Sequence, residues 1–195
     1  MQEPVRNNPG GLFCGQSIGQ GGAMHLEPAT ADDLPALHAL IESAYRGDSA
    51  RAGWSHEADL LDGQRTDLAA LAAMLADPAQ HLLVLRDNDV LRACVTVTDK
   101  GTGLAYLGML TVDPSRQAAG LGRMILAAVE DHAAAHFAAS RIEMTVIAQR
   151  DELIAWYERR GYARTGEQRP FPLDDPRFGL PTRDDLAFVV MEKRL

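Results

Sequence analysis

The residues of this chain whose spacing is best suited to chemistry form one short turn, Gln117-Ala118-Ala119-Gly120-Leu121-Gly122. Small residues let an anion approach the main chain, and glycine adopts backbone angles that bring neighbouring N–H groups together. A helix that follows adds its N-terminal amides and dipole, so the turn could hold a phosphate or a pyrophosphate without a lysine. The alternative is a strand-to-helix turn that contains glycine and binds nothing.

Two common phosphate-binding motifs do not fit this turn. The Walker sequence GxxxxGK[ST] is absent, and Arg123 follows the last glycine in place of lysine and serine or threonine. The dinucleotide fingerprint needs a third glycine, whereas Met124 and Ile125 follow here. The turn alone therefore leaves its ligand open.

A strand and a helix must position the turn. The apolar run that ends at Leu110-Thr111-Val112 predicts the strand, and Asp113-Pro114 ends it. Apolar residues at helical spacing then predict the helix: Leu121, Ile125, Leu126 and Val129.

The rest of the chain predicts one domain over residues 23–195, preceded by a flexible N-terminal extension over residues 1–22 that is rich in Gly, Asn, Gln and Pro. Thr66 is expected to cap the second helix. Helices are expected over 34–44, 68–75 and 151–160, and a proline-rich loop over 168–185. Strands are expected over 24–28, 81–86, 90–98, 104–112, 141–147, 162–167 and 186–192.

The composition excludes several classes of partner. The chain has 195 residues, of which 46% are hydrophobic and 24% charged, as in a soluble globular domain. The net charge of −8 argues against nucleic acid, because phosphate binding needs a basic face. No apolar run approaches the roughly 18–20 residues that span a bilayer, so we predict no membrane partner, and the N-terminus lacks the apolar segment of a secretory signal.

Two cysteines, Cys14 and Cys94, lie in unrelated contexts. Neither belongs to a CxxC pair or another metal-ligand spacing, so we predict no metal site. A mobile thiol and a small core residue fit a reducing compartment, and the cytoplasm is the expected location.

The turn, its flanks and the order of elements together resemble the GNAT family of N-acetyltransferases. The acetyl-CoA motif of that family is [RQ]-x-x-G-x-[GA], after a strand that ends near V-x-P. Val112-Asp113-Pro114 and Gln117-x-x-Gly120-x-Gly122 match the motif at the family's spacing, although Ala118 stands where many members have glycine. The resemblance covers about residues 24 to 195.

The resemblance implies an α+β fold, an α/β/α sandwich whose mixed, mostly antiparallel sheet has helices on both faces. The sheet would splay open between its fourth and fifth strands, 104–112 and 141–147. The pantetheine arm of acetyl-CoA would lie in that gap, on the main chain of Leu110, Thr111 and Val112. Its pyrophosphate would lie on the main-chain amides of the turn: Gln117, Ala118, Ala119, Gly120, Leu121, Gly122 and Arg123.

Residues 153–162 resemble the family's second landmark, a helix with a tyrosine that protonates the departing CoA thiolate. Tyr157 corresponds to that tyrosine, and a phenol with a pKa of about 10 stays protonated at neutral pH. Core packing is the alternative role. Members often carry asparagine seven residues earlier; Arg150 stands there and could reach a cofactor phosphate or a substrate carboxylate.

Direct attack on a thioester needs a neutral amine, hence a base or a route for its proton to water. Glu143, in the middle of the fifth strand, is the first candidate base, and Glu57 and His56 in the early loop are the others. A solvated surface group is the alternative for each.

The family builds its substrate pocket from loops that correspond to 48–65 and 168–185. Trp54, Glu57 and Arg169 are the candidate substrate-binding residues there. An acidic group could pair with an ammonium, while Arg169 or Arg65 could hold a carboxylate, which together suit a small zwitterionic amine.

These observations predict an N-acetyltransferase that moves an acetyl group from acetyl-CoA to a primary amine, a small or amino-acid-like molecule, by direct attack in a ternary complex. The alternative from another class is a catalytically silent module that binds acyl-CoA. The family also implies a homodimer.

Overall fold

Seven strands form one mixed sheet in the computed structural model, which describes residues 25–51, 53 and 55–195; the extension predicted over 1–22 lies outside them. The strands are β1 (Leu26–Pro28), β3 (Gln80–Asp87), β4 (Val90–Asp99), β5 (Leu104–Val112), β6 (Arg141–Ile147), β7 (Ala163–Pro170) and β9 (Ala187–Arg194). Their order is β1-β3-β4-β5-β6-β9-β7, and all neighbours are antiparallel except β5 and β6. The predicted mixed, mostly antiparallel sheet is confirmed.

The hairpin between β3 and β4 follows from its turn residues. Asn88 and Asp89 have φ angles of 48° and 64°, which short polar side chains tolerate. Two consecutive positive φ angles give a turn whose twist matches that of its strands. The hairpin therefore forms locally and fixes the register of β3 against β4.

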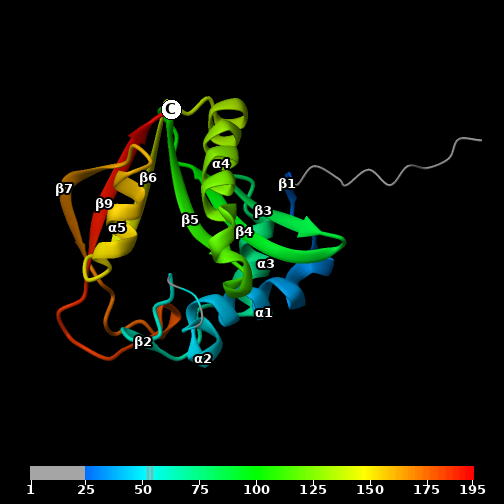
Figure 1. The fold of residues 1–195 in the computed structure, drawn as a ribbon. Helices are drawn as coiled ribbons and strands as arrows, with labels where there is room; N and C mark the ends of the chain where they lie inside the picture. The colour runs from blue at the N-terminus through cyan, green and yellow to red at the C-terminus, as the bar shows by residue number, and fades with distance from the viewer. Residues whose placement is uncertain (1–24, 52, 54) are drawn as a thin grey trace, which may run out of the picture.

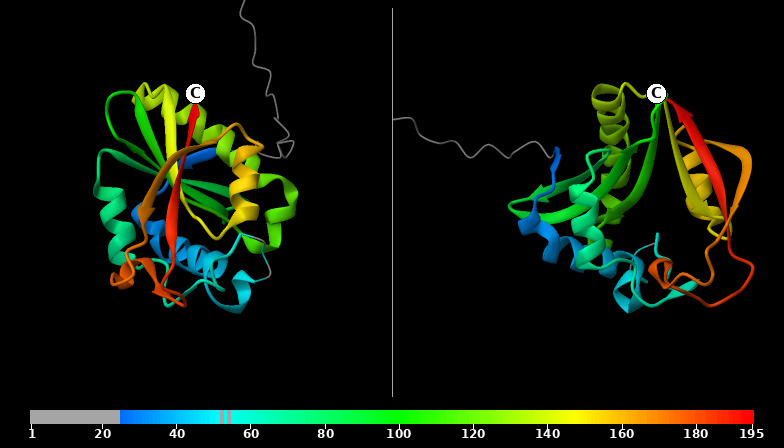
Figure 2. Two further views of the ribbon diagram at one scale, coloured as in Figure 1. Left: turned by 90° about the vertical axis from the view of Figure 1, so that its left-hand side faces the viewer. Right: turned by 180° about the vertical axis from the view of Figure 1, so that it is seen from behind.

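Helices cover both faces of the sheet, as predicted (Figure 2). Because side chains alternate along a strand, Leu82 and Val84 pack with α1 and α3 on one face, while Leu83 and Leu85 belong to the core with α4 and α5 on the other. In the described part of the chain, no helix is long and apolar enough to cross a membrane. The four longer helices of the described chain are α1 (Leu34–Tyr45), α3 (Leu68–Ala76), α4 (Leu121–Phe137) and α5 (Asp151–Glu158).

The sheet opens where β5 meets β6. Three residue pairs join these parallel strands, and the last pair is Tyr106 with Glu143. Beyond it the strands diverge, and the sheet separates into two halves (Figure 1). This is the splay predicted between residues 104–112 and 141–147, and it leaves the inner edges of β5 and β6 unpaired with each other.

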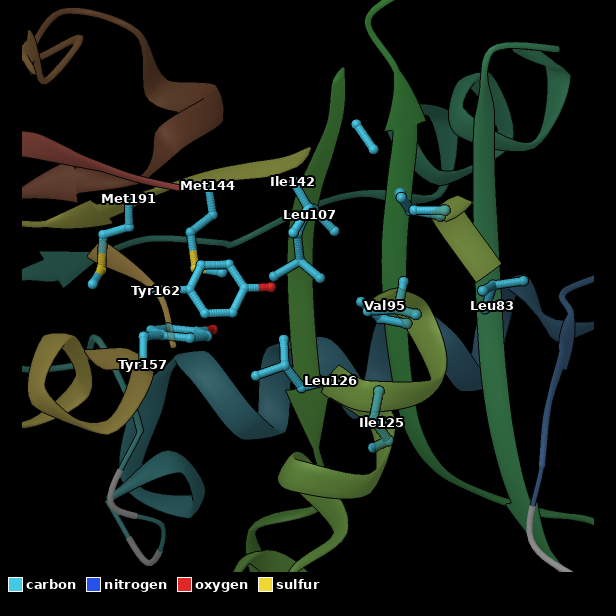
Figure 3. Packing of buried hydrophobic residues seen from close by; sticks show 14 of the residues in the cluster. Leu83, Val95, Leu107, Ile125, Leu126, Ile142, Met144, Tyr157, Tyr162 and Met191 are labelled. Carbon is cyan, nitrogen blue, oxygen red and sulfur yellow. The ribbon is translucent and has the colours of Figure 1, made fainter. Parts of the chain in front are cut away.

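One buried apolar cluster holds the two halves together. Met144 of β6 and Met191 of β9 lie beside Tyr157 of α5, while Leu107 of β5 and Leu126 of α4 approach from the other half (Figure 3). All five side chains are buried. Because the cluster is closely packed, the splay is a fixed feature of the fold.

The start of α3 differs from the sequence prediction. Asp67 caps the helix, because its carboxylate accepts a 2.7 Å hydrogen bond from the amide of Ala70. The Thr66 hydroxyl, predicted to do this, is buried without a hydrogen-bond partner in the described structure. A carboxylate at a helix N-terminus also gains from the helix dipole.

The two loops predicted to form a substrate pocket are paired with each other. β2 (Leu61–Asp62) and β8 (Leu180–Pro181) form a two-stranded sheet that the sequence did not predict. These loops lie with α2 (Gly47–Ala50) at the open end of the splay (Figure 1). β7 extends to Pro170, so Arg169 lies in a strand. Three short 3-10 helices complete the described chain: η1 (Ala31–Asp33), η2 (Pro114–Ala119) and η3 (Pro176–Phe178).

Three histidines meet between β3 and α4. His81 and His132 are joined through Nδ1 and Nε2 at 2.7 Å, and the His136 ring stacks on His132 with centroids 3.9 Å apart. Burial, followed by the charges of His136 and His81, lowers the pKa of His132 to about 4. Burial and His136 also lower the pKa of His81. Both imidazoles are therefore neutral in the folded protein at pH 7.

Acidification should destabilise the protein through this cluster. The unfolded chain protonates His132 near pH 6.5 and the folded protein only near pH 4, so the free energy of unfolding falls as the pH drops through that window. Urea unfolding at about pH 7 and about pH 5 measures how much free energy of unfolding is lost on acidification, and this loss should be smaller for His132→Gln than for wild type. The exposed His25→Gln is the control and should keep the wild-type loss. An equal loss in His132→Gln would contradict the prediction.

Candidate functional site

Two adjoining cavities lie in the splay between β5 and β6. The turn cavity, of about 100 Å³, lies between the end of β5, the turn before α4, and α5. The loop cavity, of about 290 Å³, extends between β5 and β6 to the loops at the open end. Five residues line both cavities and mark their junction: Tyr45, Leu110, Arg150, Leu153 and Tyr157.

The turn predicted to bind an anion leads directly into α4. η2 passes into Gly120, whose φ of +77° favours glycine, and the Gly120 carbonyl accepts the amides of Arg123 and Met124. In the described chain, no side chain caps the N-terminus of α4. Amides of its first turn therefore remain available to an anion in the turn cavity.

Most residues predicted to bind the cofactor do line the turn cavity: Leu110, Val112, Gln117, Gly120, Gly122, Arg123 and Arg150. Thr111 and Leu121 instead have buried side chains, with 1% and 7% exposed. These two can offer a ligand their main-chain groups alone. Ala118 and Ala119 belong to η2, and their side chains lie outside the described structure.

Gln117 and Arg150 hold an early loop over the turn cavity. Nε2 of Gln117 donates to the Ser55 hydroxyl at 3.1 Å and to the Val112 carbonyl at 3.3 Å. Gly53 packs so closely that a Cβ there would lie 2.7 Å from Oε1 of Gln117. Arg150 donates to the main-chain carbonyl of Ser55. The loop is thus fixed to both β5 and the start of α5.

Two residues that the sequence analysis missed form another wall of the turn cavity. The guanidinium of Arg160 stacks 3.6 Å from the Trp156 ring, and a Cβ at Gly122 would lie 3.4 Å from the same indole. Burial, followed by the charges of Arg159 and Arg123, lowers the pKa of Arg160. An anion near Arg123 and Arg160 would relieve this repulsion. The sequence could have indicated this pair, because Trp156 and Arg160 are four residues apart and residues at that spacing are neighbours on a helix.

A bulge in β5 borders the loop cavity. The register with β4 shifts between Cys94 and Thr96, and Met109 has a φ of 49°, which residues with a side chain rarely adopt. Gly108 is needed beside it, because a Cβ would lie 2.7 Å from Oγ1 of Thr96. A bulge re-aims main-chain groups, and strain of this kind clusters at functional sites.

Two tyrosines stand at the junction of the cavities. Burial raises the pKa of Tyr157, so its phenol is protonated at neutral pH, and no described residue hydrogen-bonds its hydroxyl. Burial also raises the pKa of Tyr45, whose hydroxyl donates to the Leu110 carbonyl at 2.9 Å. Tyr45 was not predicted, although it follows Leu37 and Ile41 at four-residue spacing.

Three arginines surround the carboxylate of Glu57. Arg46 and Arg150 bind it at 2.8 and 3.2 Å, and Nε of Arg65 lies 3.8 Å away. Burial alone would raise the pKa of Glu57, but the guanidinium groups outweigh burial and hold this pKa below its usual value. Glu57 is therefore an ionised carboxylate whose charge is already bound by arginines, so this geometry does not support the base role or the ammonium-binding role that the sequence predicted. We call these four residues the Glu57 cluster.

Two other predicted site residues bind each other outside the cavities. Arg169 donates to Glu143 at 2.9 Å and to Glu167 at 2.7 Å. Neither Glu143 nor Arg169 lines the turn cavity or the loop cavity. The geometry therefore supports neither the base role predicted for Glu143 nor the substrate role predicted for Arg169.

The remaining candidates do not complete the site. Trp54 lies outside the described residues. His56 is half-buried, its Nδ1 has no hydrogen-bond partner in the described structure, and it lines neither cavity. Within residues 25–51, 53 and 55–195, no group of three or more His, Cys, Asp or Glu is placed to hold a metal ion.

A family model described as "Acetyltransferase (GNAT) family" matches residues 35–162. No curated protein matches the sequence. At 14–18% identity for most of them, the solved structures support the fold alone.

Three solved structures illustrate the likeness. A putative acetyltransferase from Salmonella typhimurium, solved with its cofactor acetyl-CoA, has a TM-score of 0.64 at 18% identity, over 89% of this chain and 95% of that chain. A chimera of the spermidine N-acetyltransferase SpeG from Vibrio cholerae and hSSAT has a TM-score of 0.64 at 16% identity, over 88% of this chain and 95% of that chain. The ribosomal-protein-alanine N-acetyltransferase from Brucella melitensis has a TM-score of 0.65 at 18% identity, over 87% of this chain and 99% of that chain.

Removing the charge of Glu57 should destabilise the protein. Glu57→Gln leaves three arginines without their shared carboxylate, and breaking such a buried ion pair costs about 3 kcal/mol of the free energy of unfolding. Urea denaturation measures this loss. Glu167→Gln, which removes an exposed partner of Arg169, is the control and should change stability by less than about 1 kcal/mol. Equal losses in the two variants would refute the structural role.

Proposed function

Because the chain belongs to the acetyltransferase (GNAT) family, we propose that it transfers the acetyl group of acetyl-CoA to a small primary amine by direct attack in a ternary complex. The observation that carries the proposal is the position of Tyr157. Tyr157 lines both the turn cavity and the loop cavity, and burial keeps its hydroxyl protonated at neutral pH. One cavity would take the cofactor and the other the amine, with a proton donor between them.

The turn cavity fits the phosphates of CoA. Gly120 presents no side chain, the first amides of α4 are uncapped, and Arg123 and Arg160 supply positive charge. The pantetheine arm would then follow the unpaired edge of β5 from Val112 to Leu110, toward Tyr157. Extended main-chain pairing with a free strand edge is an ordinary mode of recognition.

In the proposed reaction, Tyr157 donates one proton and then regains one. The neutral amine attacks the thioester carbonyl, a C–N bond forms and the C–S bond breaks. Tyr157 gives its proton to the departing thiolate, and the acetylated nitrogen returns one proton to the phenolate through water. Despite burial, the arginines lower the pKa of Glu57 and make it a weak base, so in this proposal the amine loses its ammonium proton to water before attack.

The acceptor that we propose is a small amine or an amino-acid-like molecule. The loop cavity, of about 290 Å³, is near the lower end of the sizes usual for small-molecule sites. The cytoplasm remains the proposed location, and the buried free thiol of Cys94 is compatible with it. A homodimer also remains a proposal by family analogy.

A catalytically silent module that binds acyl-CoA is the second candidate. It is favoured by the early loop, which Gln117 and Arg150 bind at Ser55, in the wall of the turn cavity. Thiol release from acetyl-CoA over a panel of amines separates the two. Saturable CoA binding without release on any amine would favour the module.

Tyr157→Phe should lower kcat by about 100-fold, because the thiolate loses its proton donor, while the Kd for CoA stays within about twofold. Stopped-flow thiol release and calorimetry measure the two quantities. Tyr162→Phe is a matched control, since it removes a buried tyrosine hydroxyl that binds Glu130 and lines neither cavity. A wild-type kcat in Tyr157→Phe would overturn the assignment.

Gly120→Val should weaken CoA binding by at least about 10-fold, because a branched side chain would enter the proposed phosphate cradle. Gly101→Val is the matched control, because Gly101 has a φ of +73°, close to the +77° of Gly120, so valine should be similarly strained at both positions. Both positions have open space for a Cβ, and Gly101 lies in a hairpin away from the turn. Calorimetric titration with CoA should separate them, while thermal unfolding should show similar losses. Equal affinity in the two variants would contradict the cradle.

A further inference from the structure

One wall of the loop cavity carries uncompensated positive charge. The Glu57 cluster combines three guanidinium groups with one carboxylate. Glu42 adds a second carboxylate nearby, but it accepts the amides of Arg65 and Thr66 at 2.7 and 2.9 Å and faces a separate surface cavity. One positive charge therefore remains even when both carboxylates are counted.

Among the described residues, Arg65 is the arginine of the cluster whose side chain makes no hydrogen bond. Nε of Arg46 also lacks a partner, but both Nη groups of Arg46 donate hydrogen bonds. Arg46 and Arg150 donate to Glu57 and to main-chain carbonyls. Nε of Arg65 is buried without a hydrogen-bond partner in the described structure, and 26% of the side chain remains exposed. Arg65 also lines the loop cavity. A guanidinium with free N–H groups is the side chain that best matches a carboxylate, through two parallel hydrogen bonds.

Tyr45 sets the distance from Arg65 to the reaction centre. The Arg65 guanidinium lies over the Tyr45 ring, 5.2 Å from its centroid, and the Tyr45 hydroxyl reaches the Leu110 carbonyl at the cavity junction. Arg65 and the junction are therefore separated by about one tyrosine side chain. A small molecule can bridge that distance with an amine at one end and an anion at the other.

The rest of the loop cavity is lined by both apolar and uncharged polar side chains and offers no second anion. Among the described residues that line it, Glu57 is the one carboxylate, and its charge is already bound by arginines. A second ammonium group on the acceptor would therefore meet no partner. Apolar lining residues of the cavity include Leu107, Met109, Met144, Val146, Phe178 and Phe188.

We propose that the acceptor amine bears a carboxylate and that Arg65 binds this carboxylate through its Nη groups, since its Nε is buried and faces Glu57. Arg65 is then a specificity-determining residue, and the acceptor class is an amino acid with an uncharged side chain, as opposed to a polyamine. The inference rests on the proposed acetyl transfer, since it assigns the amine site of that reaction.

Matched acceptors test the proposal. The kcat/KM of the full chain is measured by thiol release with L-methionine, L-methionine amide and spermidine. Wild type should prefer the acid to the amide by about 10- to 100-fold, the effect of a charge-assisted bidentate contact. Arg65→Gln should abolish this preference by raising KM for L-methionine, with the amide unchanged. Comparing the variant with wild type cancels the different intrinsic reactivities of the two amines.

Two further variants serve as controls. Arg65→Lys should restore part of the preference, because it keeps the charge and loses the planar fork. Arg169→Gln should keep the wild-type preference, since Arg169 binds Glu143 outside the cavities. Thermal unfolding with CoA confirms that each variant is folded.

The outcomes separate this inference from the proposed function. Equal use of acid and amide by wild type, or an unchanged preference in Arg65→Gln, overturns the carboxylate site while acetyl transfer stands. Absence of thiol release with every acceptor would refute the transfer. Calorimetry on the CoA-loaded protein then decides: tighter binding of L-methionine than of its amide in wild type but not in Arg65→Gln supports the site, and equal binding overturns it.

Discussion

The pairing of β5 with β6 ends after Tyr106, and both cavities exist because of this early end. Beyond it, the N–H and C=O groups along two inner strand edges need partners other than each other. Tyr45 supplies one, at the Leu110 carbonyl, and the bulge at Met109 changes the direction of others. An extended ligand with amide groups of its own is the natural complement to such an edge.

The segments at the open end of the splay must also be held in place, because β5 and β6 do not pair there. The Glu57 cluster does this by joining three segments at one buried carboxylate: Arg46 follows α1, Arg65 ends the early loop, and Arg150 precedes α5. A charge buried in this way is costly unless every partner is present, so the cluster favours one arrangement of these segments over others. Arg150 lines both cavities, and the contact that closes the fold is thereby also part of the site.

The features that sequence predicted are those set by local chemistry. The strands β3 and β4, the glycine-containing turn before α4 and the helix that carries Tyr157 each depend on residues within a few positions. The partners of Glu57 could not be predicted, because Arg150 is distant in sequence and charged residues in loops are usually solvated. The end of β7 was also missed, since nearly all its residues are exposed and no alternation marks a strand.

The electrostatics of the junction explain how the proposed acetyl transfer to an amine could proceed with Tyr157 as the acid and without a carboxylate base. Burial keeps Tyr157 protonated, and three arginines keep Glu57 ionised, so neither group titrates near neutral pH. Positive charge close to an ammonium group destabilises its charged form and lowers its pKa. If the proposed amine binds at the junction, the arginines that hold Glu57 would also favour its neutral form, which is the nucleophile of the proposed reaction. A carboxylate on the acceptor would bind the same positive wall and bring that amine to the junction, so binding and activation would depend on one set of charges.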